Sequence, residues 1–307
     1  MTHTLTYRIH ETAPYINWSY FFHAWGFSPR FADIGHLHGC DACRAGWLSS
    51  FPETERARAA EAMQLFKDAQ RMLAQLDEDF RTYVRFGLFP ANSDGDDLIF
   101  HMPAPAHDVR LPLLRQQHAT PGKPCLCIAD YVRPLSQGVS DTVGIFAGTV
   151  DADMEHLYET GEYADDFKHM LAQTLADRLA EAAVEKMHEE VRKHYWGYAP
   201  DENLPVSALL AEKFQGVRPA VGYPSLPDQT VNFDLADLLG FSDLGISLTE
   251  NGAMIPHASV SGLMLSHPQA QYFSIGKIGE DQLKDYAQRR GIPVEKMRKF
   301  LATNLQL

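Results

Sequence analysis

One guanidinium and one aromatic ring lie close together in residues 215–228, a segment whose chemistry suits a small ligand. It reads Gln-Gly-Val-Arg-Pro-Ala-Val-Gly-Tyr-Pro-Ser-Leu-Pro-Asp, and its three prolines fix φ and remove backbone donors, which excludes a helix or a central strand. Gly216 and Gly222 let the backbone approach a neighbouring element. Arg218 can hold a carboxylate through a forked pair of hydrogen bonds, and Tyr223 offers a flat apolar face. On composition alone, a proline-rich surface connection with an incidental arginine is the simpler interpretation.

A second group of residues that could do chemistry lies in residues 35–43, Gly-His-Leu-His-Gly-Cys-Asp-Ala-Cys. His36, His38, Cys40 and Cys43 offer four ligands of the kind that zinc prefers. Their spacing is tight and is not that of a standard zinc module. A polar loop with two free thiols is therefore the favoured interpretation, and a zinc site remains a weak alternative.

Several segments carry a resemblance to a known family. The strongest is Arg218-Pro219-Ala220-Val221-Gly222-Tyr223-Pro224, and further blocks are Gly87 to Asn92, Leu114 to Gln117, Ala176 to Ala182, Val191 to Leu204, Leu248 to Glu250, Ser259 to Gly262 and Ser266 to Pro268. Taken in their order along the chain, these blocks resemble the S-adenosylmethionine-binding activation (reactivation) domain of cobalamin-dependent methionine synthase. The resemblance runs from about residue 15 to the end. It implies one large activation domain over residues 1–307, with residues 33–50 as an unusual His- and Cys-containing insertion.

The resemblance implies a function for the proline-rich loop. In the family the arginine of this loop holds the ligand carboxylate, and aromatic residues of a downstream strand contact the rest of the ligand. The residues that correspond to the family's S-adenosylmethionine site are Asn17, Glu181, Arg218, Pro219, Ala220, Gly222, Tyr223, Tyr272 and Phe273. Glu212 also stands where the family has a carboxylate. Without the resemblance, Tyr272 and Phe273 would be interpreted as core residues of a strand.

Asn17 departs from the family pattern. The family has Tyr-Ile-Asp-Trp near the N-terminus, whereas this chain has Tyr15-Ile16-Asn17-Trp18. An asparagine keeps one carbonyl acceptor but lacks the charge that would pair with the ligand ammonium. We therefore expect weaker binding, by roughly tenfold, at an otherwise intact site.

The cobalamin itself would have to be carried by another protein. The chain lacks the Asp-x-His-x-x-Gly signature of a cobalamin ligand, because Asp33 is three residues before His36 and Ile34 stands where the aspartate should be. The resemblance thus implies a free-standing reactivation subunit of a methyltransferase that makes no methionine alone. It would present S-adenosylmethionine for reductive methylation of cob(II)alamin, with a flavodoxin-like or other low-potential electron donor. The alternatives are a docking module for a corrinoid protein that no longer uses S-adenosylmethionine, and a metal-binding protein built on the His and Cys residues above.

Hydrophobic periodicity predicts the helices and strands that carry these residues. Helices are expected from Pro52 onward, from about 165 to 195, and twice near the C-terminus around Gly291 and Pro293. Strands are expected at 83–89, 98–101, 126–132, 143–150, 245–249, 259–265 and 272–278, with a turn at 92–95. In the long helix the apolar residues recur every four positions, so their line winds around the helix and should bury a different face in each half. The pattern predicts an α+β fold, with a mainly antiparallel, bent sheet flanked by helices.

The bulk properties exclude some classes of protein. A formal net charge of −13 over 307 residues argues against a nucleic-acid groove and against binding to an anionic membrane. The first ten residues are polar, and we find neither a signal peptide nor an apolar run long enough to span a membrane. Four cysteines are too few for a disulfide framework, which favours a reducing, cytoplasmic location, and Cys125 and Cys127 are expected to be structural.

Overall fold

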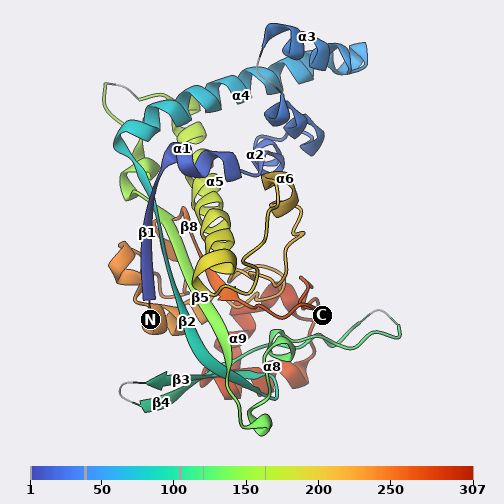
Figure 1. Ribbon diagram of the computed structural model, residues 1–307, viewed down its shortest axis with the longest axis vertical. Helices are drawn as coiled ribbons and strands as arrows, with labels where there is room; N and C mark the ends of the chain where they lie inside the picture. Colours follow the sequence, from blue (N-terminus) through green and yellow to red (C-terminus); the bar gives the residue numbers. More distant parts are fainter. Residues whose placement is uncertain (1, 38–39, 104–105, 120, 163, 307) are drawn as a thin grey trace.

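The computed structural model describes residues 2–37, 40–103, 106–119, 121–162 and 164–306, and they form an antiparallel sheet with a helical layer at one end (Figure 1). The strands are β1 (Thr2–Arg8), β2 (Arg81–Asp94), β3 (Asp97–Pro103), β4 (Ala106–Pro112), β5 (Asp141–Val150), β6 (Ser247–Leu248), β7 (Met254–Ile255) and β8 (Ser259–Met264). The helices are α1 (Ile9–Thr12), α2 (Trp18–Ala24), α3 (Asp41–Ser49), α4 (Glu53–Asp79), α5 (Asp166–Glu190), α6 (Val206–Leu209), α7 (Val231–Leu239), α8 (Glu280–Arg290) and α9 (Val294–Phe300).

The main sheet is built around one long strand. Six strands take part, with the path β4-β3-β2-β5-β8 and with β1 also paired to β2. β2 pairs with β1 through its first half and with β3 through residues 91–94, while β5 runs beside it over residues 82–91. All these ladders are antiparallel. The predicted α+β class with a mainly antiparallel sheet is therefore confirmed.

The long helix α5 lies across this sheet and joins two cores. In its first half Leu171, Leu175 and Leu179 pack into a core shared with α1, α2 and α4. In its second half Val184 and Met187 pack with side chains of the sheet, as does Val191 directly after the helix. The winding apolar line thus buries different faces in the two halves, as its four-residue spacing predicts. Gly148 of β5 permits the close approach, since a Cβ there would lie 2.4 Å from a methyl group of Val184.

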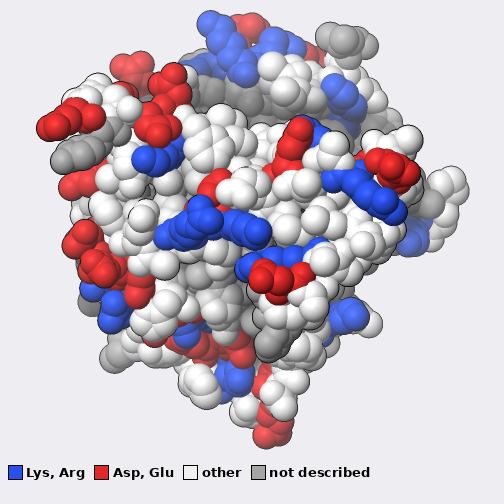
Figure 2. Space-filling model, turned by 90° about the horizontal axis from the view of Figure 1, so that it is seen from above, with Lys and Arg blue, Asp and Glu red and all other residues white. Residues whose placement is uncertain are grey.

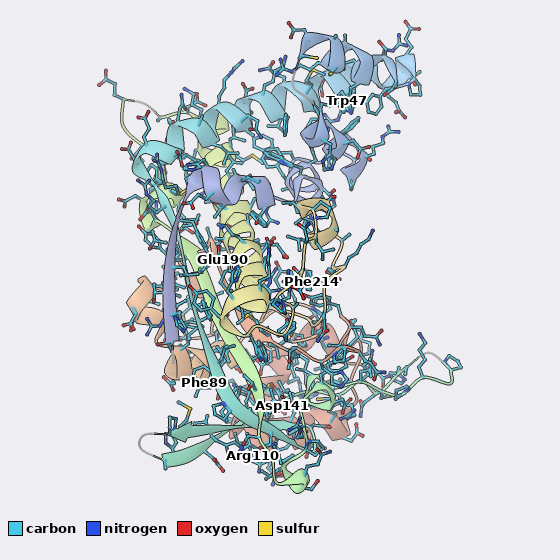
Figure 3. The ribbon with its side chains drawn as sticks, in the orientation of Figure 1. Trp47, Phe89, Arg110, Asp141, Glu190 and Phe214 are labelled. Atoms are coloured by element: carbon cyan, nitrogen blue, oxygen red, sulfur yellow. The ribbon has the colours of Figure 1, made fainter. Side chains whose placement is uncertain are left out.

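The helical layer is made by the segments that flank α4. Pro52 is the N-cap of α4, and the predicted apolar stripe of this helix faces the core. Residues 29–36 form 3₁₀ turns, and α3 packs beside α4 with Trp47 in the core at the far end of the layer (Figure 3). The described residues of the predicted insertion, 33–37 and 40–50, therefore belong to this layer.

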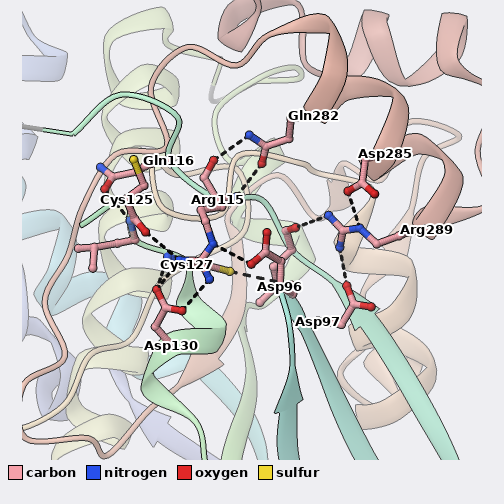
Figure 4. A network of polar contacts seen from close by, with 12 residues as sticks. Asp96, Asp97, Arg115, Gln116, Cys125, Cys127, Asp130, Gln282, Asp285 and Arg289 are labelled. Atoms are coloured by element: carbon pink, nitrogen blue, oxygen red, sulfur yellow. Dashed lines mark hydrogen bonds and ion pairs between the residues drawn. The ribbon is translucent and has the colours of Figure 1, made fainter. Parts of the chain in front are cut away.

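A polar network fastens the opposite end of the sheet to α8 (Figure 4). Arg115 pairs with Asp96 at 2.7 Å and binds both oxygens of Asp130 at 2.6 and 2.8 Å. The backbone of Arg115 exchanges two hydrogen bonds with the side-chain amide of Gln282 on α8. Arg289, also on α8, binds Asp97 at the start of β3.

The strand predicted at residues 126–132 is wrong. Cys127 makes a single bridge to Arg115, and residues 128–131 then turn into a 3₁₀ helix. Asp130 sets this turn because its carboxylate accepts the backbone N–H of Cys127 at 2.8 Å. Cys127, Ile128 and Ala129 are all buried, so the segment lacks the alternation of a strand. Cys127 is structural, and burial raises the pKa of its thiol to about 12.

The strand predicted at residues 272–278 is also wrong. This segment is extended, but its backbone bonds to loops instead of to a sheet. Phe273 N–H donates to the Ser225 hydroxyl at 3.2 Å, and Ile275 N–H donates to the Pro224 carbonyl at 2.8 Å. Farther on, Ile278 bonds to residues near the C-terminus.

Smaller differences between the predicted and the observed elements concern where they begin and end, and some short elements that were not predicted. β2 continues through Asp94, so the predicted turn at 92–95 is displaced toward Gly95 and Asp96. β1, β4 and the helices α1–α3, α6 and α7 were not predicted. The remaining predicted elements are confirmed, with the strand expected at 245–249 reduced to β6.

The hydropathy of the helices and the distribution of surface charge complete the description of the fold. Among the described residues, no helix is both long enough and apolar enough to cross a membrane. The face seen from above carries Lys and Arg side chains interspersed with Asp and Glu (Figure 2), so the acidic excess does not form one continuous patch there.

Candidate functional site

The proline-rich loop is pinned along the edge strand β8. Val217 exchanges backbone hydrogen bonds with Leu265, and Val221 N–H donates to Ser261 at 2.9 Å. Gly262 allows this contact, because a Cβ at that position would lie 2.1 Å from the Pro219 carbonyl oxygen. Gly216 has the same role within the loop, with φ +86° and a would-be Cβ only 2.3 Å from the Leu265 carbonyl oxygen. The loop is irregular, as predicted, but its backbone is held at both ends.

Arg218 points from this loop to the face of α5. Its Nη2 lies 2.9 Å from an oxygen of Glu185, and its guanidinium lies 5.4 Å from the centroid of the Phe146 ring. Both side chains of this pair are largely buried, with 14% and 11% exposed. Burial disfavours the charged form of Arg218, but Glu185, Tyr272 and Glu181 together outweigh burial, so the guanidinium pKa is raised.

Glu181 stands one turn before Glu185 on the same face of α5. One of its carboxylate oxygens accepts a hydrogen bond from the Tyr223 hydroxyl at 2.6 Å, and the other accepts one from Arg178 at 2.9 Å. Burial, together with Glu181, raises the pKa of the Tyr223 hydroxyl, which therefore stays a donor.

Asn17 is the N-cap of α2. Its side-chain oxygen accepts the backbone N–H of Ser19 at 3.1 Å, which is the usual task of an asparagine at this position. The single carbonyl acceptor of Asn17 is thus already engaged by the chain itself.

Tyr272 and Phe273 approach the loop from the C-terminal segment. The Tyr272 hydroxyl accepts the backbone N–H of Arg218 at 2.9 Å, and the backbone of Phe273 is bonded to the Ser225 hydroxyl. Burial raises the pKa of Tyr272 as well.

These groups enclose one cavity of about 440 Å³, a size typical of small-molecule sites. Its lining comes from α2, α5, the segment around α6, the proline-rich loop and the C-terminal segment: Tyr15, Asn17, Tyr20, Glu181, Ala182, Glu185, Leu209, Leu210, Glu212, Phe214, Arg218, Pro219, Ala220, Tyr223, Pro224, Ser225, Val260, Tyr272 and Phe273. Phe214 lies beside the lower half of α5 (Figure 3). A larger cavity of about 950 Å³ lies on the other side of residues 205–211 and shares Asn17 and Leu210 with the first.

Two buried polar atoms at the cavity have no partner among the described residues. They are Nε of Arg218 and the second carboxylate oxygen of Glu185. Leaving such groups unpaired costs about 1–3 kcal/mol each, so their persistence in a wall of a cavity indicates a binding site. A ligand that bears both a carboxylate and an ammonium has the groups to pair with them.

The structure brings together all but one of the sequence-predicted site residues. Gly222 is the exception, since it does not line the cavity. With φ +86° and its N–H donating to Leu226 at 2.8 Å, Gly222 instead turns the chain so that Tyr223 faces Glu181. Sequence reasoning missed Glu185, although its spacing of four residues from Glu181 places both on one helix face.

The described members of the His and Cys group, His36, Cys40 and Cys43, do not line this cavity. His36 lines the larger cavity, while Cys40 and Cys43 begin α3, where the Cys43 N–H donates to the Cys40 sulfur at 3.3 Å. His38 lies outside the described residues. Among the residues that are described, no group of three or more His, Cys, Asp or Glu side chains could hold a metal ion. All four cysteines are free thiols.

Comparison with known proteins decides the family. The family described as the vitamin B12 dependent methionine synthase activation domain matches residues 8–291. The chain belongs to this family. It is also similar to a solved structure, the crystal structure of the MetH reactivation domain bound to AdoHcy, at 37% sequence identity and a TM-score of 0.86. The match covers 100% of this chain and 91% of the chain in that crystal structure.

Membership in this family agrees with the architecture. The family model and the solved structure confirm the predicted family and the predicted α+β fold.

Proposed function

We propose that this chain binds S-adenosylmethionine in the cavity of Arg218 and presents its methyl group to a reduced cobalamin carried by a partner protein. On this proposal residues 1–307 act as one free-standing reactivation unit of a cobalamin-dependent methionine synthase. An electron donor of low potential, such as a flavodoxin-like protein, reduces cob(II)alamin before the methyl transfer. The four free thiols support a reducing, cytoplasmic setting.

The observation that carries the proposal is the half-satisfied pair of Arg218 and Glu185. Arg218 uses one nitrogen for Glu185 and leaves Nε unpaired, so the ligand carboxylate can take the open side of the guanidinium. Glu185 in turn keeps one oxygen for the ligand ammonium. The solved relative, whose ligand is AdoHcy, supports a ligand of this chemical class.

The other walls suit the rest of the ligand. Tyr223, Tyr272 and Phe273 offer aromatic faces for an adenine ring or for the sulfonium cation. The chain's own contribution to the reaction is to bind and orient the ligand, because a held methyl group needs only alignment with its acceptor. S-adenosylmethionine supplies the methyl group, and the partner's cobalamin accepts it.

The test is reactivation in trans. The purified protein alone should make no methionine from methyltetrahydrofolate and homocysteine. Mixed with a cognate methionine synthase that lacks this domain, S-adenosylmethionine and a low-potential donor, it should convert cob(II)alamin to methylcobalamin, seen as loss of the cob(II)alamin absorbance band. Arg218→Ala is the matched control and should leave the band in place.

Two outcomes would contradict the proposal. The band would persist with the correct partner, or it would decay equally fast without this protein. If the protein binds the partner but not S-adenosylmethionine in calorimetry, the docking-module alternative gains, which the loss of a charged acceptor at Asn17 would favour.

A further inference from the structure

Two cysteines lie together at the start of α3, outside the cavity of Arg218. Cys40 is the N-cap of this helix, and Cys43 lies in its first turn. The Cys43 N–H donates to the Cys40 sulfur at 3.3 Å, and the Cys40 carbonyl accepts the N–H of Arg44 at 3.0 Å. Residues three apart at a helix start are neighbours, so the closed turn keeps both thiols on one side of α3.

The two thiols interact with each other and differ in character. A hydrogen bond from the Cys43 thiol to the Cys40 sulfur is the main cause that lowers the pKa of Cys40 and raises the pKa of Cys43. The backbone N–H groups of residues 43 and 42 lower the pKa of Cys40 further. The charged neighbours Asp41 and Arg44 pair with each other at 3.5 Å. An activated thiol followed by a second thiol in Cys-x-x-Cys is the arrangement of a nucleophile and its resolving group.

The surface around the thiols is open to another molecule. α3 lies at the outer edge of the helical layer, at the top of Figure 1. Cys40 is exposed and Cys43 is half-buried, and their neighbours Ala42, Ala45 and Gly46 are small and exposed. A Cβ added at Gly46 would meet no atom within 4 Å. Access of this kind is one of the factors that set the rate of thiol–disulfide exchange.

The other two cysteines lack this combination. Cys127 is buried, its thiol donates to the Asp96 carbonyl at 3.9 Å, and burial raises its pKa to about 12. Cys125 and Cys127 belong to an irregular segment and not to the first turn of a helix. The chain therefore contains its own controls for the reactivity of Cys40 and Cys43.

We propose that Cys40 and Cys43 form a thiol–disulfide exchange site whose substrates are accessible disulfides of small molecules, of the class of oxidised glutathione. The Cys40 thiolate attacks one sulfur of the substrate, so that a mixed disulfide forms, the substrate S–S bond breaks and one thiolate leaves. The Cys43 thiolate then attacks the Cys40 sulfur and expels the second thiolate. The substrate is reduced to two thiols, the two cysteines are oxidised to one disulfide, and their two protons end on the leaving groups.

Closure of the disulfide is the first measurement. The purified full chain is equilibrated with mixtures of reduced and oxidised glutathione, alkylated, and mapped by mass spectrometry. As the oxidised fraction rises, the peptide that holds residues 40–43 should lose two hydrogen atoms and resist alkylation. Cys125→Ser is the matched control, because it removes one thiol elsewhere, and it should form this disulfide as readily as the parent.

Two variants separate the nucleophile from the resolving thiol. Cys43→Ala should stop at the mixed disulfide, with one glutathione bound to Cys40. Cys40→Ala should form a mixed disulfide at Cys43 about tenfold more slowly, because Cys43 is less accessible and is not activated.

Three results would overturn the proposal. The first is the absence of a disulfide between Cys40 and Cys43 in every glutathione mixture. The second is an equal rate of mixed-disulfide formation in Cys40→Ala and Cys43→Ala. The third is stoichiometric zinc that must be removed before the thiols react, which would make the pair part of a metal site. S-adenosylmethionine binding, measured on the same samples, tests the proposed function separately.

Discussion

Two arginine–glutamate pairs lie near the C-terminal end of α5, and they differ in how many carboxylate oxygens the arginine binds. Arg192 binds both oxygens of Glu202, at 2.9 and 2.6 Å, and has 0% of its side chain exposed. Its guanidinium also lies 4.0 Å from the centroid of Phe214. Arg218 binds one oxygen of Glu185 and leaves Nε and the other oxygen unpaired.

The difference separates a pair that holds the fold from a pair that can exchange partners. In the first pair both oxygens of Glu202 are engaged, so it has no free carboxylate oxygen, although Nη1 of Arg192 also has no hydrogen-bond partner among the described residues. Breaking this pair leaves a buried charge uncompensated. A pair joined through one hydrogen bond at a cavity wall can accept a carboxylate on one member and an ammonium on the other. His188, buried beside both arginines, belongs with the first kind, because burial and then the two cations lower its pKa well below the ordinary value and keep it neutral.

The largest expected effect is on Arg192. Arg192→Ala leaves Glu202 buried without its partner, and we expect the free energy of unfolding to fall by about 3–5 kcal/mol. Urea denaturation measures this change. The double variant Arg192→Met with Glu202→Leu removes both charges and should recover most of the loss. A single variant as stable as the parent would show that this pair does not hold the fold.

Arg218→Ala should chiefly affect binding. We expect S-adenosylmethionine affinity to drop by about 2 kcal/mol or more, roughly 30-fold, because the ligand carboxylate has no other guanidinium in the cavity lining. The free energy of unfolding should fall less than in Arg192→Ala, because solvent in the cavity can hydrate Glu185. Calorimetry and urea denaturation give the two numbers. Binding within about threefold of the parent would place the ligand carboxylate elsewhere.

Asn17→Asp should tighten binding by up to roughly tenfold. Aspartate caps a helix as well as asparagine does, so the hydrogen bond to Ser19 that begins α2 is kept while a charged acceptor is added. The dissociation constant for S-adenosylmethionine is the measurement, with the melting temperature as the control for the cap. An unchanged constant would mean that residue 17 does not face the ligand ammonium.

Tyr272→Phe should have the smallest effect. It removes the acceptor for the Arg218 backbone N–H while keeping the ring, so we expect a loss of less than about 1 kcal/mol in stability and a few-fold weaker binding. Tyr7→Phe, which removes a hydroxyl bonded to Glu190 away from the cavity, is the matched control for ligand binding. Equal losses of affinity in the two variants would mean that the hydroxyl of Tyr272 does not support the loop.

The family and the fold class could be inferred from the sequence alone, and most of the residues that line the cavity of Arg218 were named from it. Proline fixes φ locally and glycine permits close approach locally, so the irregular loop around Arg218 can be recognised without a structure. Helical periodicity likewise depends only on residue spacing, which is why the two-faced burial of α5 could be predicted. The family resemblance supplied the residues that now line one cavity.

The hydrogen-bond and ion-pair partners of those residues could be read only from the tertiary structure. The segments 126–132 and 272–278 have strand-like sequences, but Asp130 in one case and Ser225 with Pro224 in the other supply hydrogen bonds that replace a ladder. In the same way, the pairing of Arg218 with Glu185 does not follow from spacing, since it depends on a contact between segments far apart in the chain. Hydrogen bonds and ion pairs form over a few ångströms, and the fold alone sets those distances.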